Sequence, residues 1–292
     1  MNQKTIFALG FFDGVHLGHQ ALLTACKELA EAHSCQAGVV TFTDHPDAIV
    51  LGNAPALINT ISNRVSLLKE FGVDKVVELP FDRAMQSMSW RDFVRKLQEE
   101  YDAAGFVCGH DFRFGHRGEG TAPILRDYCK EAGLPCIVVP EQVVAGITVS
   151  STHIRKLLEA GEVKAANRLL GHAHILSGVV VEGKQLGRKL GFPTANLILP
   201  QGILIPKRGV YATEVFVEGV VYPAVTNVGE RPTVNGQNVN VECYLLDFAG
   251  DLYGKEITVA FCEFLRPEQK FDSLDALRAQ IATDTDKVRE ML

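Results

Sequence analysis

The sequence predicts two domains: an α/β domain built on a parallel sheet, then a β-rich domain, an antiparallel barrel or sandwich, that ends in a helix. The length of 292 residues is typical of two domains. From Lys4 to Gly171 short apolar runs alternate with helical patterns, which favours a parallel sheet with helices on both faces. Beyond Gly171 β-branched alternation replaces the helices, which favours antiparallel strands. We therefore place the domains at residues 1–171 and 172–292.

The first domain alternates strand and helix along its whole length. Apolar, β-branched runs predict the strands, and apolar residues spaced three and four apart predict the helices. Ser89 stands where it would cap one of these helices, and Ser150 or Ser151 would cap another. The predicted strands are residues 5–9, 36–42, 74–79, 105–108 and 135–140, and the predicted helices are residues 21–32, 63–71, 89–101, 122–132 and a helix that opens at 150–151.

The second domain reads as strands closed by one helix. Glu218-Gly219 joins two of the strands as a two-residue hairpin would. In the final helix, residues 273–292, Leu274, Leu277 and Ile281 fall on one face. The predicted strands are residues 175–182, 209–217, 220–228, 238–245 and 256–264.

Composition argues against several classes of protein. The net charge is −6 and Lys/Arg blocks are absent from the sequence, so nucleic acid is not expected as a partner. The sequence has neither an apolar run of membrane-span length nor a secretory signal pattern, so no membrane is expected. The seven cysteines are scattered and never form C-x-x-C, which predicts reduced thiols in the cytoplasm and argues against zinc.

The stretch from Gly10 to Gln20 joins the first strand to the first helix and carries His16 and His19. Backbone N–H groups and the positive end of the helix dipole gather at a helix start, which suits a phosphate. Histidine adds donors that follow charge onto a transferring phosphoryl group. The alternative is that the two histidines serve only in capping and packing.

Further polar clusters follow other predicted strands, at the sheet edge where ligands bind in such folds. They are residues 41–46, 108–115 and 149–155. Arg155, one turn into its helix, would project a cation near that end, which suits a phosphate. The alternative for this last cluster is an N-cap alone.

Residues 183–196 of the second domain combine glycines with cations, which suggests a flap over phosphates; the alternative is an ordinary surface loop. Thr194 and Asn196 lie two apart in an extended segment, so both side-chain oxygens face one way, which suits Mg²⁺. The P-loop motif occurs nowhere in the sequence.

At these residues the chain resembles the bifunctional prokaryotic riboflavin kinase/FAD synthetases nearly end to end. The N-terminal motifs are GFFDGVHLGH at 10–19, TFTDHP at 41–46, GHDFRFG at 109–115 and SSTHIR at 150–155. The C-terminal motifs are GRKLGFPTAN at 187–196, RGVY at 208–211, NVGERPT at 227–233 and VECYLLDF at 241–248. Phe11, where the family favours Asn or Lys, and Thr43-Asp44, where it often has a proline, depart from the pattern.

The resemblance implies a Rossmann-like nucleotidyltransferase domain followed by a β-barrel kinase domain. The kinase would convert riboflavin and ATP to FMN and ADP, and the first domain would convert FMN and ATP to FAD and pyrophosphate. The partners implied are therefore riboflavin, FMN, FAD and ATP, with Mg²⁺ and no obligatory protein partner.

In the first domain the resemblance implies that His16 and His19 contact phosphates in the transition state. Asp13 either binds nucleotide or fixes the loop. Asp111 either orients substrate or holds Mg²⁺, and Phe112 and Phe114 either face the isoalloxazine ring or pack in the core. The nucleotide-binding residues would be Gly10, Phe11, Asp13, Gly14, Gly18, Ser151, Thr152 and Arg155, and the flavin-binding residues His45, Pro46, Asp111, Phe112 and Phe114.

In the second domain the resemblance implies that Glu242 is the general base for the ribityl hydroxyl, with Asp247 as the alternative base. Every histidine lies at or before His174, so a carboxylate is the natural base here. Thr194 and Asn196 would hold Mg²⁺. The flap over ATP would contain Gly187, Arg188 and Gly191, and Arg266 would contact the flavin phosphate. Rival interpretations are a chain with one decayed activity, a flavin-binding regulator, and another adenylyltransferase with an appended β domain.

Overall fold

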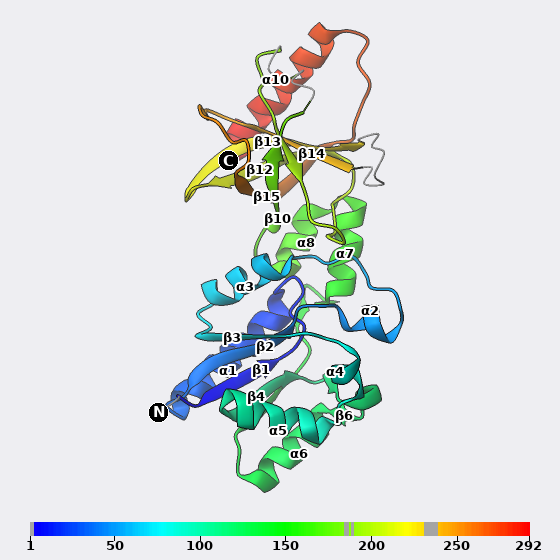
Figure 1. The fold of residues 1–292 in the computed structure, drawn as a ribbon. Coiled ribbons are helices and arrows are strands. Elements are labelled where there is room, and N and C mark those ends of the chain that lie inside the picture. Colours follow the sequence, from blue (N-terminus) through cyan, green and yellow to red (C-terminus); the bar gives the residue numbers. More distant parts are fainter. Residues whose placement is uncertain (1–2, 184–186, 188–189, 231–238) are drawn as a thin grey trace. The chain divides into compact units, whose positions relative to one another are not determined.

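The computed structural model describes residues 3–183, 187, 190–230 and 239–292. The chain divides into two compact units, residues 1–57 with 61–150 and residues 58–60 with 151–292. The first unit is α/β and the second is mainly β, so the predicted fold classes are confirmed (Figure 1). Within the described ranges, no helix combines the length and apolar character that a membrane span requires.

A five-stranded parallel sheet organises the first unit. Its strand order is β3-β2-β1-β4-β7. The strands β2 and β3 are therefore added on one side of β1, and β4 and β7 are then added on its other side. The carboxyl ends beside β1 therefore lie at a topological switch point, where ligands bind in such sheets. The strands are β1 (Thr5–Leu9), β2 (Gln36–Phe42), β3 (Lys75–Leu79), β4 (Ala103–Gly109) and β7 (Cys136–Val139).

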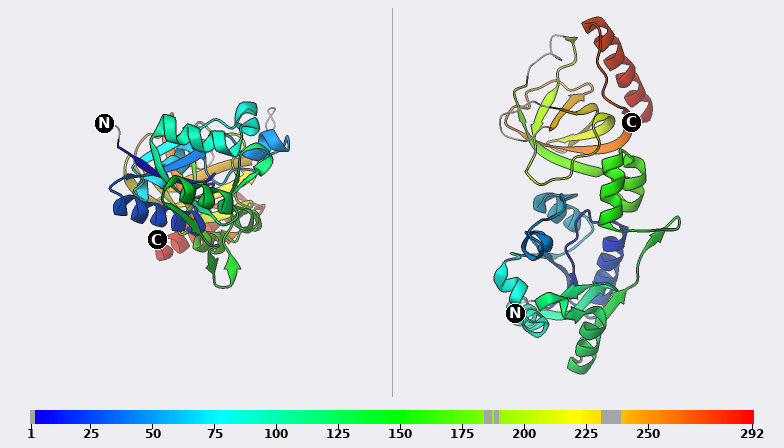
Figure 2. Two further views of the ribbon diagram at one scale, coloured as in Figure 1. Left: turned by 90° about the horizontal axis from the view of Figure 1, so that it is seen from below. Right: turned by 90° about the vertical axis from the view of Figure 1, so that its right-hand side faces the viewer.

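Helices cover both faces of this sheet (Figure 2). Phe93 and Leu97 of α5 and Leu125 of α6 pack with Phe7 and Phe106 of the sheet in one buried cluster. The helices of this unit are α1 (Leu17–Ala32), α2 (Pro46–Val50), α3 (Ile61–Glu70), α4 (Arg83–Ser87), α5 (Trp90–Tyr101), the 3-10 helix η1 (His116–Gly118) and α6 (Ala122–Ala132); two small hairpins pair β5 (Arg113–Phe114) with β6 (Gly120–Thr121) and β8 (Val143–Val144) with β9 (Ile147–Thr148).

The predicted elements are present in the predicted order, with differences at helix starts. Sequence reasoning missed the short helices, the helix at residues 163–170 and the strand at residues 195–198. Helix α1 begins at Leu17 rather than at residue 21, because His16 caps it inside the loop motif. The helices α2 and α4 have five residues each, too few to show a 3.6-residue period. Ser89 caps α5 as predicted, accepting a hydrogen bond from the Asp92 N–H.

The second unit begins with α7 (Ser151–Ala160) and α8 (Val163–Leu170) and continues as a closed antiparallel barrel rather than a sandwich. The barrel order is β10-β11-β14-β13-β12-β15. Glu218 and Gly219 both have positive φ, 50° and 84°, as a two-residue turn between twisted strands requires. The strands are β10 (His174–Val181), β11 (Ala195–Ile198), β12 (Gly209–Val217), β13 (Val220–Glu230), β14 (Val239–Leu245) and β15 (Glu256–Arg266).

Helix α10 (Leu274–Met291) ends the second unit and packs against the barrel. Leu277 and Ile281 line a barrel pocket, and Val288 is fully buried. Leu274 shares the predicted helix face with these two residues, but it is 57% exposed and does not take part in the packing. It lies in the first turn, directly after the Ser273 cap, and the inward face continues instead through Asp284.

We expect Ser89→Ala to lower the free energy of unfolding by about 1 kcal/mol, because the Asp92 N–H loses its acceptor at the start of a core helix. The measurement is urea unfolding followed by circular dichroism. Ser87→Ala is the matched control, because Ser87 is exposed and its hydroxyl donates to the Ala84 carbonyl without capping a helix start. Equal losses in the two variants would contradict the prediction.

Candidate functional sites

The loop between β1 and α1 turns sharply at residues with positive φ. Gly14 has φ 85°, and Phe12 and Val15 also have positive values, 59° and 39°. For a β-branched residue such as Val15 this conformation is strained, and strain of this kind gathers at functional sites. The turn places His16 at the N-terminus of α1.

His16 and His19 form a stacked pair at this helix start. Their ring centroids are 3.6 Å apart with the planes 10° from parallel, and Nδ1 of His16 accepts a hydrogen bond from the His19 N–H at 3.2 Å. A Cβ on Gly18 would lie 3.1 Å from the His16 ring, so glycine keeps this space open. Burial, with smaller effects from His16 and Arg64, holds the pKa of His19 well below its usual range. His19 is therefore neutral at neutral pH.

Asp13, in the same loop, is 2% exposed and has interactions with its surroundings. Burial lowers the pKa of Arg64, a residue of α3, and the Asp13 carboxylate opposes this shift in part. The burial of Asp13 favours its loop-fixing role. Gly10 donates its N–H to the Val40 carbonyl at 3.3 Å, which ties the loop to β2.

An aromatic cavity of about 760 Å³ lies at the ends of β2 and β4. Phe112 and Phe114 line it and are stacked, with centroids 5.3 Å apart at 17°. Phe114 also belongs to the core, whereas Phe112 is half-buried, so core packing applies to Phe114 and contact with the isoalloxazine ring stays a prediction for both rings. Sequence reasoning missed most of the wall: Phe42, Val50, Phe81, Met85, Met88, Phe93, Arg113, His116 and Arg117.

Of the remaining flavin candidates in the first unit, one lines the aromatic cavity and two do not. Pro46 lines the cavity. His45 caps α2, accepting from the Asp47 N–H at 3.1 Å, and its ring meets Phe11 edge-on at 4.7 Å. Asp111 is exposed in the turn after β4.

Three nucleotide candidates lie in the second unit. Ser151, Thr152 and Arg155 occupy the first turns of α7, which groups with the barrel. Ser151 and Arg155 are half-buried and make interactions, and Thr152 is exposed. Their participation in one site with the histidines stays a prediction.

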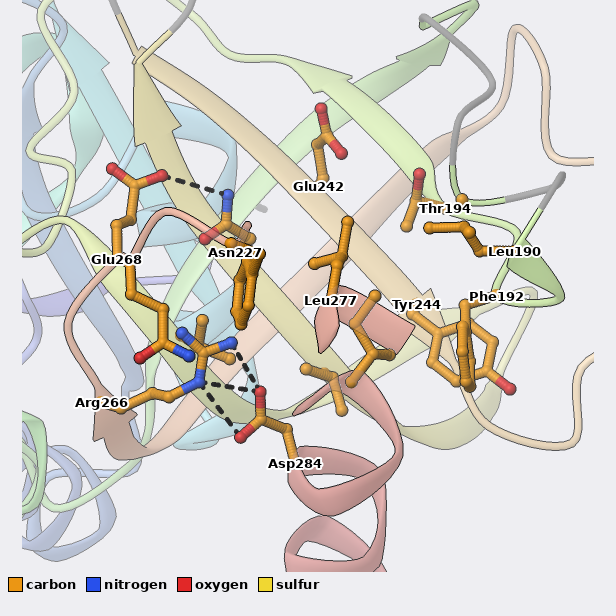
Figure 3. Close-up of a pocket in the computed structure, with 16 residues that line it drawn as sticks. Leu190, Phe192, Thr194, Asn227, Glu242, Tyr244, Arg266, Glu268, Leu277 and Asp284 are labelled. Carbon is orange, nitrogen blue, oxygen red and sulfur yellow. Dashed lines mark hydrogen bonds and ion pairs between the residues drawn. The ribbon is translucent and has the colours of Figure 1, made fainter. Parts of the chain in front are cut away.

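A pocket of about 350 Å³ opens into the barrel, and Glu242 of β14 lines it (Figure 3). Asn240 donates a hydrogen bond to the Glu242 carboxylate and another, at 3.3 Å, to Oδ1 of Asn196. Glu242 pairs in register with Asn196 of β11 on one side and Asn227 of β13 on the other. The carboxylate is thus held at a pocket wall, not displayed on a solvent-facing strand.

An ion pair forms another wall of this pocket. Nε and Nη2 of Arg266 donate to Asp284 Oδ2 at 2.9 and 2.7 Å, and Asp284 is 1% exposed. Gln280 donates to the same carboxylate at 2.9 Å. In Figure 3 Leu277 lies between this ion pair and Glu242. Sequence reasoning missed Asp284 and the apolar walls Leu190, Phe192, Tyr244, Phe271 and Ile281.

Oxygen donors lie near Glu242. Thr194 lines both this pocket and a smaller cavity of about 90 Å³ beside Leu252 and Tyr253. Asn196 is 5% exposed, and its Oδ1 faces the Asn240 amide. Neutral oxygens beside a carboxylate fit a hard divalent cation that is also bound by phosphates. Among the described residues no group of three or more His, Cys, Asp or Glu is arranged to hold a metal.

The flap candidates are described in part. The Gly187 carbonyl accepts from the Phe192 N–H at 2.8 Å, and Gly191 has φ 89°. Arg188 lies outside the described residues. Asp247, the alternative base, is exposed and bound by both terminal nitrogens of Arg289 at 2.7 Å; these hydrogen bonds hold the pKa of Asp247 below its usual range. That pairing favours Glu242 over Asp247 as the base.

Comparisons with known proteins agree with this division. A family described as FAD synthetase matches residues 1–153, and a family described as riboflavin kinase matches residues 170–292. The bifunctional riboflavin kinase/FMN adenylyltransferase of Escherichia coli (strain K12) is 38% identical over 288 residues, which covers 98% of this chain and 92% of the relative. The enzyme of the same name from Listeria monocytogenes is 34% identical, with coverages of 97% and 91%.

A solved structure has the same fold over almost the whole chain. It is described as a macrolide-efflux protein from Streptococcus pneumoniae, with a TM-score of 0.90, 32% identity and coverages of 99% and 95%. Its description names efflux, whereas both family matches and the curated relatives above name flavin enzymes.

We expect Asp284→Asn to lower the free energy of unfolding of the barrel unit by about 3 kcal/mol, because it leaves Arg266 without its buried carboxylate. The measurement is urea unfolding. Asp247→Asn is the matched control, since it breaks an exposed ion pair between the barrel and the same helix and should leave the midpoint nearly unchanged. Similar midpoints for both variants would contradict the importance of the buried pair.

Proposed function

The chain belongs to the family of bifunctional riboflavin kinase/FMN adenylyltransferases, and from this premise we propose which residues perform its two reactions. The C-terminal domain transfers the γ-phosphoryl group of ATP to riboflavin, giving FMN and ADP. The N-terminal domain transfers AMP from ATP to FMN, giving FAD and pyrophosphate. Both reactions use ATP with a divalent metal, and we propose Mg²⁺.

The observation that carries the assignment of the kinase site is the carboxylate of Glu242 at the wall of the barrel pocket. In the proposed step Glu242 takes the proton from the 5′-hydroxyl of the ribityl chain. The freed oxygen bonds to the γ-phosphorus while the bond to the ADP oxygen breaks. The hydrogen bond from Asn240 supports this role, because it holds the carboxylate in one orientation.

Thr194 and Asn196 are the proposed metal ligands, supported by their oxygens beside Glu242. A bound Mg²⁺ supplies charge that neutralises the ATP phosphates. Gly187, Arg188 and Gly191 are the proposed flap over the phosphates, and Arg266 contacts the flavin. The ion pair with Asp284 supports the last role, since it orients the guanidinium at the pocket wall.

Adenylyl transfer needs no protein nucleophile, because the FMN phosphate attacks the α-phosphorus of ATP directly and pyrophosphate leaves. We propose that His16 and His19 contact the phosphates during this step, supported by their stacking at the start of α1. The loop residues Gly10, Phe11, Gly14 and Gly18 hold the nucleotide, and the buried Asp13 fixes the loop. Ser151, Thr152 and Arg155 hold the leaving pyrophosphate. The aromatic cavity beside Pro46, Phe112 and Phe114 takes the isoalloxazine ring, with His45 and Asp111 at its margin.

We also retain two proposals on organisation. The domain boundary lies near residues 171 and 172, directly after α8, which ends at Leu170, and near residue 170, where the riboflavin kinase match begins; by compactness alone, α7 and α8 group with the barrel. All seven cysteines are free thiols, which supports work in the reducing cytoplasm.

We expect Glu242→Gln to lower FMN formation from riboflavin by about 100-fold or more, because the amide cannot take the hydroxyl proton. Chromatography of flavins after incubation with riboflavin, ATP and Mg²⁺ measures this loss. Supplied FMN should still be converted to FAD at the normal rate. Equal loss of both activities would contradict two separate sites.

We expect the reverse from His16→Ala, which should lower conversion of FMN to FAD by about 100-fold while FMN formation continues. His16→Asn is the control for the lost helix cap, because asparagine caps well. It should recover stability without recovering FAD formation. Full activity in the asparagine variant would reduce His16 to a capping role.

A further inference from the structure

Arg64 is a fully buried cation at the edge of the sheet where the proposed adenylylation site lies. It belongs to α3 and has no exposed surface. Its Nη1 donates to the carbonyls of Phe11 and Phe42, each at 3.0 Å, and to Oγ1 of Thr41 at 3.2 Å. One nitrogen thus ties the loop after β1 to the end of β2, and it does so from a helix more than fifty residues along the chain from Phe11.

The other two nitrogens of this guanidinium are unsatisfied. Nε and Nη2 of Arg64 are enclosed and have no hydrogen-bond partner among the described residues. Arg266 in the same chain presents the same two nitrogens to the carboxylate of Asp284. Nε and Nη2 together form the donor fork of the guanidinium. Because buried polar groups that lack hydrogen-bond partners are costly and rare, the empty fork of Arg64 indicates that a ligand binds there.

The surroundings indicate where this ligand comes from. The Phe11 ring lies over the guanidinium at 4.1 Å and is half-exposed, so it separates Arg64 from solvent. The positive charge of Arg64 also lowers the pKa of His19, which is consistent with Arg64 acting on the histidine pair. Phe11 is the loop residue that departs from the family pattern.

We propose that Nε and Nη2 of Arg64 bind two oxygens of a substrate phosphate during FAD formation, and that the Phe11 ring moves aside to admit it. A planar guanidinium fork matches two phosphoryl oxygens. The phosphate belongs to FMN or to the pyrophosphate part of ATP, so the inference rests on the proposed function of this domain. The alternative is that Arg64 only clamps the ends of β1 and β2.

Arg64→Lys separates these roles. Lysine keeps the charge and its ammonium can serve the three acceptors of Nη1, but it has no fork. We expect its urea midpoint to stay near that of the unmodified protein, while its affinity for the cognate phosphate falls on the order of 10- to 100-fold. Arg64→Met removes clamp and fork together and should lose both stability and affinity.

The experiment measures calorimetric binding of pyrophosphate and of FMN separately, together with FAD formation from FMN and ATP. FMN formation from riboflavin in the same samples is the control for the intact kinase domain. Weaker binding of pyrophosphate assigns the fork to ATP, and weaker binding of FMN assigns it to the flavin phosphate. Arg64→Lys that binds both ligands and forms FAD within twofold of the unmodified protein overturns the proposal.

A second pair of variants keeps the test independent of stability. Phe11→Asn removes the cover and should raise phosphate affinity about threefold or more when Arg64 is present, but not in the Arg64→Lys background. Equal effects in both backgrounds overturn the proposed pairing. If the unmodified protein forms no FAD, the proposed function fails instead, and pyrophosphate binding still tests Arg64.

Discussion

Taking charge out of water is the constraint on which both candidate sites depend. A charge buried without partners costs several kcal/mol, so each one has to be matched by the fold. In the barrel the carboxylate of Asp284 meets Arg266 and Gln280, and this contact fastens the C-terminal helix to the pocket wall. In the α/β unit Arg64 is matched at one nitrogen alone among the described contacts. The hydrogen bonds of Asp284 are thus made within the protein, whereas those of Arg64 are completed by the proposed phosphate.

Strand register decides what surrounds each reactive group. Because β11 and β14 pair antiparallel, Asn196 lies opposite Glu242, and the alternation of β14 turns Asn240 to the same side. A slip of one residue would turn the carboxylate away from the pocket. In the parallel sheet, the central place of β1 brings its loop beside the ends of β2 and β4. The histidine pair and the aromatic cavity lie at that edge for this reason.

The departure at Phe11 gains a physical explanation from the structure. A small or polar residue there would leave the Arg64 guanidinium without the aromatic face that now covers it. The ring also meets His45 edge-on, which links the loop to the first turn of α2. With phenylalanine at position 11, the side chain covers a buried cation and limits access to it. This consequence could not be inferred from the motif alone.

The sequence by itself determined the order of the elements, the two fold classes and the family, because these depend on local periodicity and on motifs such as those around His16 and Thr194. It also supplied candidate side chains such as His16, His19 and Glu242, but not most of the walls of the two pockets. The closed barrel confirms what the resemblance implied, whereas only the tertiary structure decided that Leu274 faces solvent and that Arg64 and Asp284 are buried beside the candidate sites. A lone charged residue in a helix has the local pattern of a solvated surface position. Its burial follows from partners far along the chain, which leave no local signal.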